Sequence, residues 1–247
     1  MKHILLAILS LNLALLPTTA SANECNRHLE KGTPNNSDQI LCRDGYAVGY
    51  NYQNKVSNWV AYHITKESVN AFYERSNRFK TDTDLPENFR ATSNDYSKSG
   101  YDRGHLAPSG TMDFSQESMQ QSFLMSNMAP QLPGFNRGGW KGLEEKVRNW
   151  ANAYDELYVV SGPVWDGNET YIGNGVYIPN SFYKVILDPY YNDAIAFIIP
   201  HRKVSSSELS SFITTVDEVE EATQLNFFSE LPDNIENEIE AQMWDMW

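Results

Sequence analysis

A histidine and an arginine separated by a single glycine are the most informative pair of residues in the chain. They are His105 and Arg103, in a stretch whose composition predicts extended backbone, and Gly104 between them permits close backbone approach. Side chains two positions apart in a strand point to the same face. An arginine can hold two phosphate oxygens at once, and an imidazole that titrates near ~6.5 can accept a proton at physiological pH. The pair suits phosphodiester hydrolysis, although a lone histidine is more often structural.

Two further polar residues flank the start of a helix that we expect over residues 138–154. Asn136 precedes this helix, and on pattern alone an N-cap is favoured over a metal ligand. As a ligand, its amide oxygen would suit Mg²⁺, which takes few protein oxygens and keeps several waters. Glu144 either pairs with Arg148 at i,i+4 on the surface or, half exposed beside the apolar stripe, orients a water on the metal.

Other polar residues nearby have less specific interpretations. Asn127 follows an apolar segment and fits either a turn or an active site. Positive charge near the site could come from seven residues, Arg75, Arg78, Lys80, Arg103, Arg137, Lys141 and Arg148.

The elements that must position these residues are short strands separated by long loops. Strands are expected over residues 45–51, 59–65, 157–163, 183–187 and 194–200. The polar composition of residues 87–100, with Asn and Ser, predicts a loop, and Ser115 is placed to cap a short helix. A second long helix is expected after the capping box at Ser205, with an apolar stripe that continues to Val219. This pattern predicts an α+β fold with a mainly antiparallel central sheet, helices and long loops.

The first residues have the composition of a secretory signal. A basic start is followed by an apolar run over residues 4–16 and by Ala20-Ser21-Ala22, so we expect a signal peptide over residues 1–22. The run is too short to span a bilayer comfortably. The expected mature protein, residues 23–247, is then one domain that is secreted or periplasmic and not held in a membrane.

The chain has two cysteines, Cys25 and Cys42. In an exported protein, one disulfide is the simplest interpretation, and two buried free thiols are the alternative. The bridge would tie residues 23–44 as an irregular N-terminal arm, and the chain-entropy model assigns it about 3 kcal/mol.

The net charge of −13 is unusual for a protein that acts on polyanions. Residues 217–247 hold ten acidic residues and no Lys or Arg, whereas residues 23–216 carry 22 acidic and 18 basic residues. A hydrolase holds its substrate only transiently, so local positive charge at the site is enough.

The polar set resembles the DNA/RNA non-specific endonuclease family, the ββα-metal nucleases with an Asp-Arg-Gly-His signature. The resemblance runs from about Asn58 to Phe228. It includes Asp102-Arg103-Gly104-His105, Trp59-Val60-Ala61-Tyr62, Phe79-Lys80-Thr81-Asp82, Gly162-Pro163 and Pro179-x-x-Phe182-Tyr183-Lys184. It implies a ββα-metal nuclease motif within the fold.

The resemblance also implies roles for single residues. His105 matches the general base, Arg103 the phosphate contact, Asn136 the sole protein ligand of Mg²⁺ and Glu144 a residue near the waters on the ion. Asn127 matches another polar active-site position. A further family arginine could be Arg75 or Arg78, and Arg137 is an additional candidate for substrate binding.

The expected function is an exported, Mg²⁺-dependent endonuclease that cleaves DNA and RNA, leaves 5′-phosphate ends and accepts Mn²⁺ as a possible substitute. A phosphodiesterase for smaller substrates is the alternative enzyme. A catalytically silent nucleic-acid-binding module would be expected to lack His105 or Asn136, and both are present.

Overall fold

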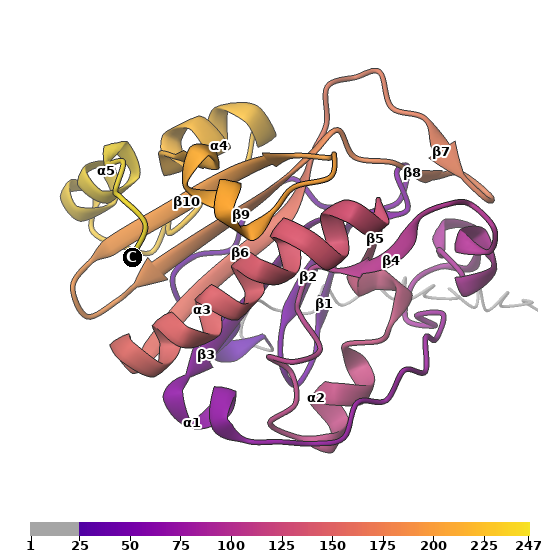
Figure 1. Ribbon diagram of the computed structural model, residues 1–247, viewed down its shortest axis with the longest axis horizontal. Helices are drawn as coiled ribbons and strands as arrows, with labels where there is room; N and C mark the ends of the chain where they lie inside the picture. The colour runs from indigo at the N-terminus through magenta and orange to yellow at the C-terminus, as the bar shows by residue number, and fades with distance from the viewer. Residues whose placement is uncertain (1–24) are drawn as a thin grey trace, which may run out of the picture.

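A seven-stranded antiparallel sheet forms the centre of the computed structural model, which describes residues 25–247 (Figure 1). The expected signal peptide therefore lies outside the described residues. The strands run in the order β1-β2-β3-β6-β9-β10-β11. Their bounds are β1 Gln39–Cys42, β2 Ala47–Asn51, β3 Val56–Thr65, β6 Glu156–Val164, β9 Ser181–Asp188, β10 Asp193–Pro200 and β11 Ile213–Thr214. The prediction of an α+β fold with a mainly antiparallel sheet is confirmed.

Both faces of this sheet are covered, which explains why its strands are apolar almost throughout. On β3, Val60 and Tyr62 face one apolar cluster, and Trp59 and Ala61 face the other. The first cluster is shared with α3 (Lys141–Tyr154). The second is shared with α4 (Val216–Thr223) and α5 (Asp233–Ala241), which lie on the opposite side of the sheet (Figure 1).

A second, two-stranded antiparallel ribbon lies on the α3 side of the sheet. It pairs β4 (Asp102–His105) with β5 (Met128–Gln131), so the two residues of the initial motif are on β4. The chain then passes through a wide helical turn, Phe135–Trp140, directly into α3. Gly138 breaks the helical geometry there, and a Cβ at that position would collide with the carbonyl oxygen of Val204. Ribbon, turn and helix together form a ββα unit.

Side-chain caps begin the shorter helices. Thr65 caps α1 (Lys66–Asn70), and Ser115 caps α2 (Gln116–Gln121) as expected. Ser205 does form a capping box, but the long helix expected after it is wrong. A 3₁₀ helix, Ser206–Phe212, is followed by strand β11, and α4 begins separately after the cap Thr215. The apolar stripe is thus divided between two elements, because the pairing of β11 with β10 interrupts it.

The remaining segments are less regular. The N-terminal arm contains a 3₁₀ turn, Asn26–Leu29, and edge strand β1, so it is more ordered than expected. The predicted loop over residues 87–100 holds two 3₁₀ turns, Glu87–Phe89 and Ser93–Tyr96. A small hairpin pairs β7 (Tyr171–Ile172) with β8 (Val176–Tyr177). Within residues 25–247, no helix has the length and apolar character needed to cross a membrane.

Candidate active site

The ββα unit and the segment around Arg75 and Phe79 line an open cavity of about 590 Å³. Six of the eight residues predicted for the site line this cavity: His105, Arg103, Asn136, Arg137, Glu144 and Arg75. The structure thus brings together side chains from strand β4, from the turn before α3, from α3 itself and from the loop at residue 75.

His105 has its imidazole among aromatic rings at the cavity wall. Its ring centroid is 5.0 Å from that of Phe123 and 6.0 Å from that of Phe79. Trp140 Nε1 donates a hydrogen bond of 3.0 Å to the His105 carbonyl and so fixes the backbone. Neither nitrogen of the His105 ring is hydrogen-bonded to another described residue. Burial, assisted by the charge of Arg75, lowers the pKa of His105 to about 3, so the ring is neutral at physiological pH.

Arg103 is held firmly on the same wall of the cavity. Its Nη2 donates a 2.7 Å hydrogen bond to the Ser93 carbonyl, and its guanidinium lies over the rings of Phe79 and Tyr96 at 5.2 and 5.7 Å. Arg103 and His105 therefore share one cavity, as their spacing predicts. The close approach that Gly104 permits is made by the Gln131 side chain rather than by backbone.

Asp102 joins the ribbon to the turn before α3. Its carboxylate accepts hydrogen bonds from Asn136 Nδ2 at 2.9 Å and from Arg137 Nε and Nη2 at 2.8 and 2.7 Å. Burial opposes ionisation, but these bonds and the arginine charge outweigh it and hold the Asp102 pKa below its usual range. Asp102 has no predicted role; its position at the start of the motif, beside Arg103, was the available signal.

The N-cap interpretation of Asn136 is wrong. Helix α3 begins after Trp140, and no side chain caps it. Asn136 lies in the preceding turn and gives its amide nitrogen to Asp102, which orients the amide oxygen without using it. No other described residue donates to that oxygen, so it is available as a hard oxygen ligand in the cavity.

Glu144 lies half-buried on the first turn of α3. The surface pair with Arg148 does not form; the i,i+4 ion pair of this helix joins Lys141 to Glu145 at 3.5 Å. Burial raises the pKa of Glu144, and the charges of Lys184, Arg148 and Arg75 oppose that rise. The carboxyl therefore keeps its proton to a higher pH than an exposed glutamate does.

Lys184 is a functional candidate without a counterpart among the predicted site residues. It is fully buried under Trp140, with its Nζ 4.5 Å from the ring centroid and 3.3 Å from the Tyr62 hydroxyl. Burial lowers its pKa, and Glu144 raises it. In the sequence, the signal that could have identified Lys184 is its position inside an otherwise apolar strand.

Asn127 lies below the cavity rather than in its wall. Its side chain is fully buried and makes three hydrogen bonds to backbone: it accepts from Ala107 N at 2.8 Å and donates to the carbonyls of Ala107 and Ser122 at 2.9 Å each. Two of these bonds hold the loop after His105, and the third ties Asn127 to the end of α2. These contacts agree with the turn interpretation, and the active-site role of Asn127 stays a prediction.

The two arginines that compete for one predicted role are placed differently. Arg75 lines the main cavity, donates to Asn77 Oδ1 at 2.7 Å and to Ser109 Oγ, and lies over the Phe123 ring. Arg78 lines only the neighbouring cavity of about 450 Å³, together with Arg75 and Lys80. All seven basic residues proposed from the sequence line one of these two cavities.

A histidine and an arginine on a β-ribbon, an asparagine in the turn that follows and a glutamate on the next helix define a ββα-metal nuclease. The profile of the DNA/RNA non-specific endonuclease family matches residues 25–234, and the chain belongs to that family.

Curated relatives extend over most of the chain. Nuclease C1 of Cunninghamella echinulata is 36% identical over 221 residues, covering 82% of this chain and 88% of its own. Mitochondrial endonuclease G of Caenorhabditis elegans is 32% identical over 241 residues, with 90% and 77% covered.

A solved structure of the EndoG/EndoGI complex has a similar chain, with a TM-score of 0.77 and 33% identity over 87% of this chain and 95% of that one. The protein is accordingly a metal-dependent endonuclease that acts on nucleic acid, and the silent binding module is excluded.

Proposed function

We propose that the protein is an exported, Mg²⁺-dependent endonuclease that cleaves DNA and RNA alike, with His105 as the general base. The observation that carries the proposal is an imidazole that is neutral, unpaired and set in a cavity lined by five basic residues. A neutral histidine can take a proton from an attacking water, and the basic residues can offset the charge of the phosphate.

Asn136 would hold the metal ion. The residues fit the ion, because a neutral amide oxygen of fixed orientation stands free in an open cavity and Asp102 is occupied by its own hydrogen bonds. When bound, Mg²⁺, or Mn²⁺ as a substitute, supplies positive charge to the phosphate and the leaving oxygen. Glu144, on the helix that follows this turn, would orient water by accepting a hydrogen bond.

Arg103 would bind a non-bridging phosphate oxygen, since its carbonyl contact and the flanking rings hold the guanidinium in place. Arg75 and Arg137 would extend the contact along the strand. Contacts to the backbone carry no sequence information, so we expect low sequence preference and, from the family resemblance, 5′-phosphate products.

Export is supported by two independent features. The first 22 residues have the composition of a signal peptide. The bridge Cys25–Cys42 is formed in the structure, and such bridges persist mainly in oxidising compartments.

The test is digestion of supercoiled plasmid and of structured RNA by the purified mature protein. Cleavage of both is expected in Mg²⁺ and in Mn²⁺ and none in EDTA, with scattered cut sites and ends that a ligase can join. A single consensus at the cut ends would contradict the backbone contacts. Hydrolysis of small phosphodiesters alone would favour the phosphodiesterase instead.

A further inference from the structure

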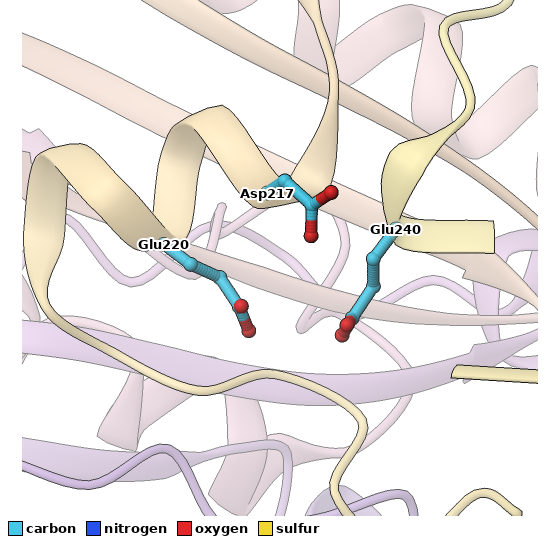
Figure 2. A group of neighbouring side chains, drawn as sticks. All are labelled: Asp217, Glu220 and Glu240. Atoms are coloured by element: carbon cyan, nitrogen blue, oxygen red, sulfur yellow. The ribbon is translucent and has the colours of Figure 1, made fainter. Parts of the chain in front are cut away.

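The acidic C-terminal segment brings three carboxylates together far from the active site. Asp217 and Glu220 come from α4 and Glu240 from α5, and ligand oxygens of the three lie within 4.8 Å of one another. Figure 2 shows the three side chains extending from the two helices toward a common space. The helices pack on the face of the sheet opposite α3, so this cluster is separate from the nuclease cavity.

Glu240 is an unusual member of this group because it is buried without a partner. Glu240 is only 5% exposed, and its Oε1 accepts no hydrogen bond from any described residue. A buried carboxylate that lacks a partner is costly, so it must either take up a proton or neutralise its charge with a cation.

No side chain of the segment can supply that positive charge, since residues 217–247 contain no Lys or Arg. The charged groups that act on Glu240 are Glu220, Glu236 and Asp217, all of them carboxylates. Burial first, and then these neighbours, raise the pKa of Glu240 to about 8. Burial also raises the pKa of Glu220 and that of Glu236. For Glu220 the rise is opposed by a hydrogen bond of 2.6 Å that the Phe227 N–H donates to its Oε1.

We propose that Asp217, Glu220 and Glu240 form a calcium site that joins α4 to α5. Oxygen-only ligands with several carboxylates are typical of Ca²⁺, which binds at about 2.3–2.6 Å and tolerates irregular geometry. Oxygens on opposite sides of such an ion are up to about 4.6–5.2 Å apart, against about 4.0–4.2 Å for Mg²⁺. Ligand oxygens that all lie within 4.8 Å of one another can share an ion of this size.

Two further points concern the place of this cluster in the chain. Glu240 lies beyond residues 25–234, the part that matches the family profile. The ion would also add a polar link between two short helices, of eight and nine residues, that already share one apolar cluster.

The pH dependence has a definite sign. Because the folded-state pKa of Glu240 is raised from 4.5 to about 8, the folded protein holds this proton more tightly than the unfolded chain does. Stability without the ion therefore falls as pH rises between these values. Calcium must displace the proton, so its stabilising effect is expected to be larger at pH 8 than at pH 6.

The experiment measures the melting temperature of metal-stripped mature protein at pH 8 and at pH 6. In 10 mM CaCl₂ at pH 8 we expect a rise of about 3–8 °C, assuming a dissociation constant in the range of extracellular calcium modules. The rise should shrink at pH 6 and should be smaller in 10 mM MgCl₂. An absent rise at pH 8, or an equal rise with magnesium, would overturn the proposal.

Matched variants locate the ion. Glu240→Gln should lose the calcium-induced rise while remaining at least as stable as wild type without the ion, because the amide resembles the protonated carboxyl and cannot ionise. Glu238→Gln, on an exposed position of the same helix, should keep the rise. Asn136→Ala should also keep it, since the nuclease cavity is not involved. If Glu240→Gln folds poorly, Asp217→Asn, at an exposed position, serves in its place.

Nuclease activity gives an independent control. Glu240→Gln should retain wild-type cleavage at 25 °C in Mg²⁺, because Glu240 does not reach the active site. A calcium rise that persists in both Glu240→Gln and Asp217→Asn, or that disappears in Asn136→Ala, would place the ion elsewhere and defeat the inference.

Discussion

In the nuclease cavity and in the carboxylate cluster, burial shifts the pKa of the central titratable residue in opposite directions. Burial lowers the pKa of His105 to about 3 and raises that of Glu240 to about 8. Each group is thereby kept neutral: the histidine keeps a free nitrogen lone pair, whereas the glutamic acid must give up its proton before it can bind a cation. The positive charge of the first region and the negative charge of the second explain why the net charge of −13 is a poor guide to the substrate.

Loss of the proposed general base should reduce nuclease activity and leave the stability of the fold unchanged. His105→Ala is expected to reduce turnover by about 10²–10⁴-fold, the usual contribution of a general base. Steady-state cleavage of plasmid and a thermal melt measure the two effects, with Glu238→Gln as the matched control from the acidic region. Turnover near that of wild type in a folded His105→Ala protein would rule out this mechanism.

The metal ligand should give the next largest effect. Asn136→Ala removes the free amide oxygen, so the Mg²⁺ concentration for half-maximal activity should rise by more than about tenfold to a hundredfold, the scale for loss of a group that only orients a ligand. Asp102→Asn is the companion, because it disturbs the partner of Asn136 and leaves the amide in place; its effect should stay within that range. An unchanged Mg²⁺ requirement in Asn136→Ala would mean that the ion is held by other residues.

Substitutions of Arg75 and Arg78, which line neighbouring cavities, should have effects of different size. Arg75→Ala should lower kcat/KM by about 10- to 100-fold, equivalent to the 1.5–3 kcal/mol of a hydrogen bond to a charged group. Arg78→Ala should raise KM only a few-fold and reduce the dependence of log KM on log salt by about one. Cleavage rates at several salt concentrations provide both values, and equal losses in the two variants would show that the cavities act as one.

The smallest effect on activity is expected from the disulfide, which belongs to neither region. Cys25→Ser with Cys42→Ser should lower the free energy of unfolding by about 3 kcal/mol. Activity at 25 °C should stay within twofold, because neither cysteine lines the nuclease cavity. Urea unfolding and plasmid cleavage measure these effects, and a large loss of activity in a folded variant would connect the arm to the site.

Much of the fold and most of the site could be predicted because they rest on local patterns. The apolar runs locate β3, β6, β9 and β10 within a few residues, since strands covered on both faces are apolar throughout. Arg103 and His105 share a cavity because residue spacing in a strand determines the face.

The parts that could not be predicted depend on contacts between distant segments. Asn136 has the sequence context of a cap, but a wide turn delays the start of α3, and Asp102, 34 positions earlier, takes its amide nitrogen. The sequence leaves Asn127 between a turn and an active-site position, and its burial under the loop after His105 depends on a segment 20 residues away. The break between Ser205 and α4 likewise follows from the pairing of β11 with β10.

The two outer strands of the central sheet have a consequence for self-association. Strands β1 and β11 are only four and two residues long, so neither edge presents a long row of free backbone groups to another copy. The bridge from Cys42 at the end of β1 to Cys25 secures one of these edges. If it opened and β1 detached, the five residues of β2, four of them buried, would become the edge. Reduction would then expose a template for aggregation, so we expect the reduced protein to form β-rich aggregates at concentrations where the oxidised protein stays dispersed.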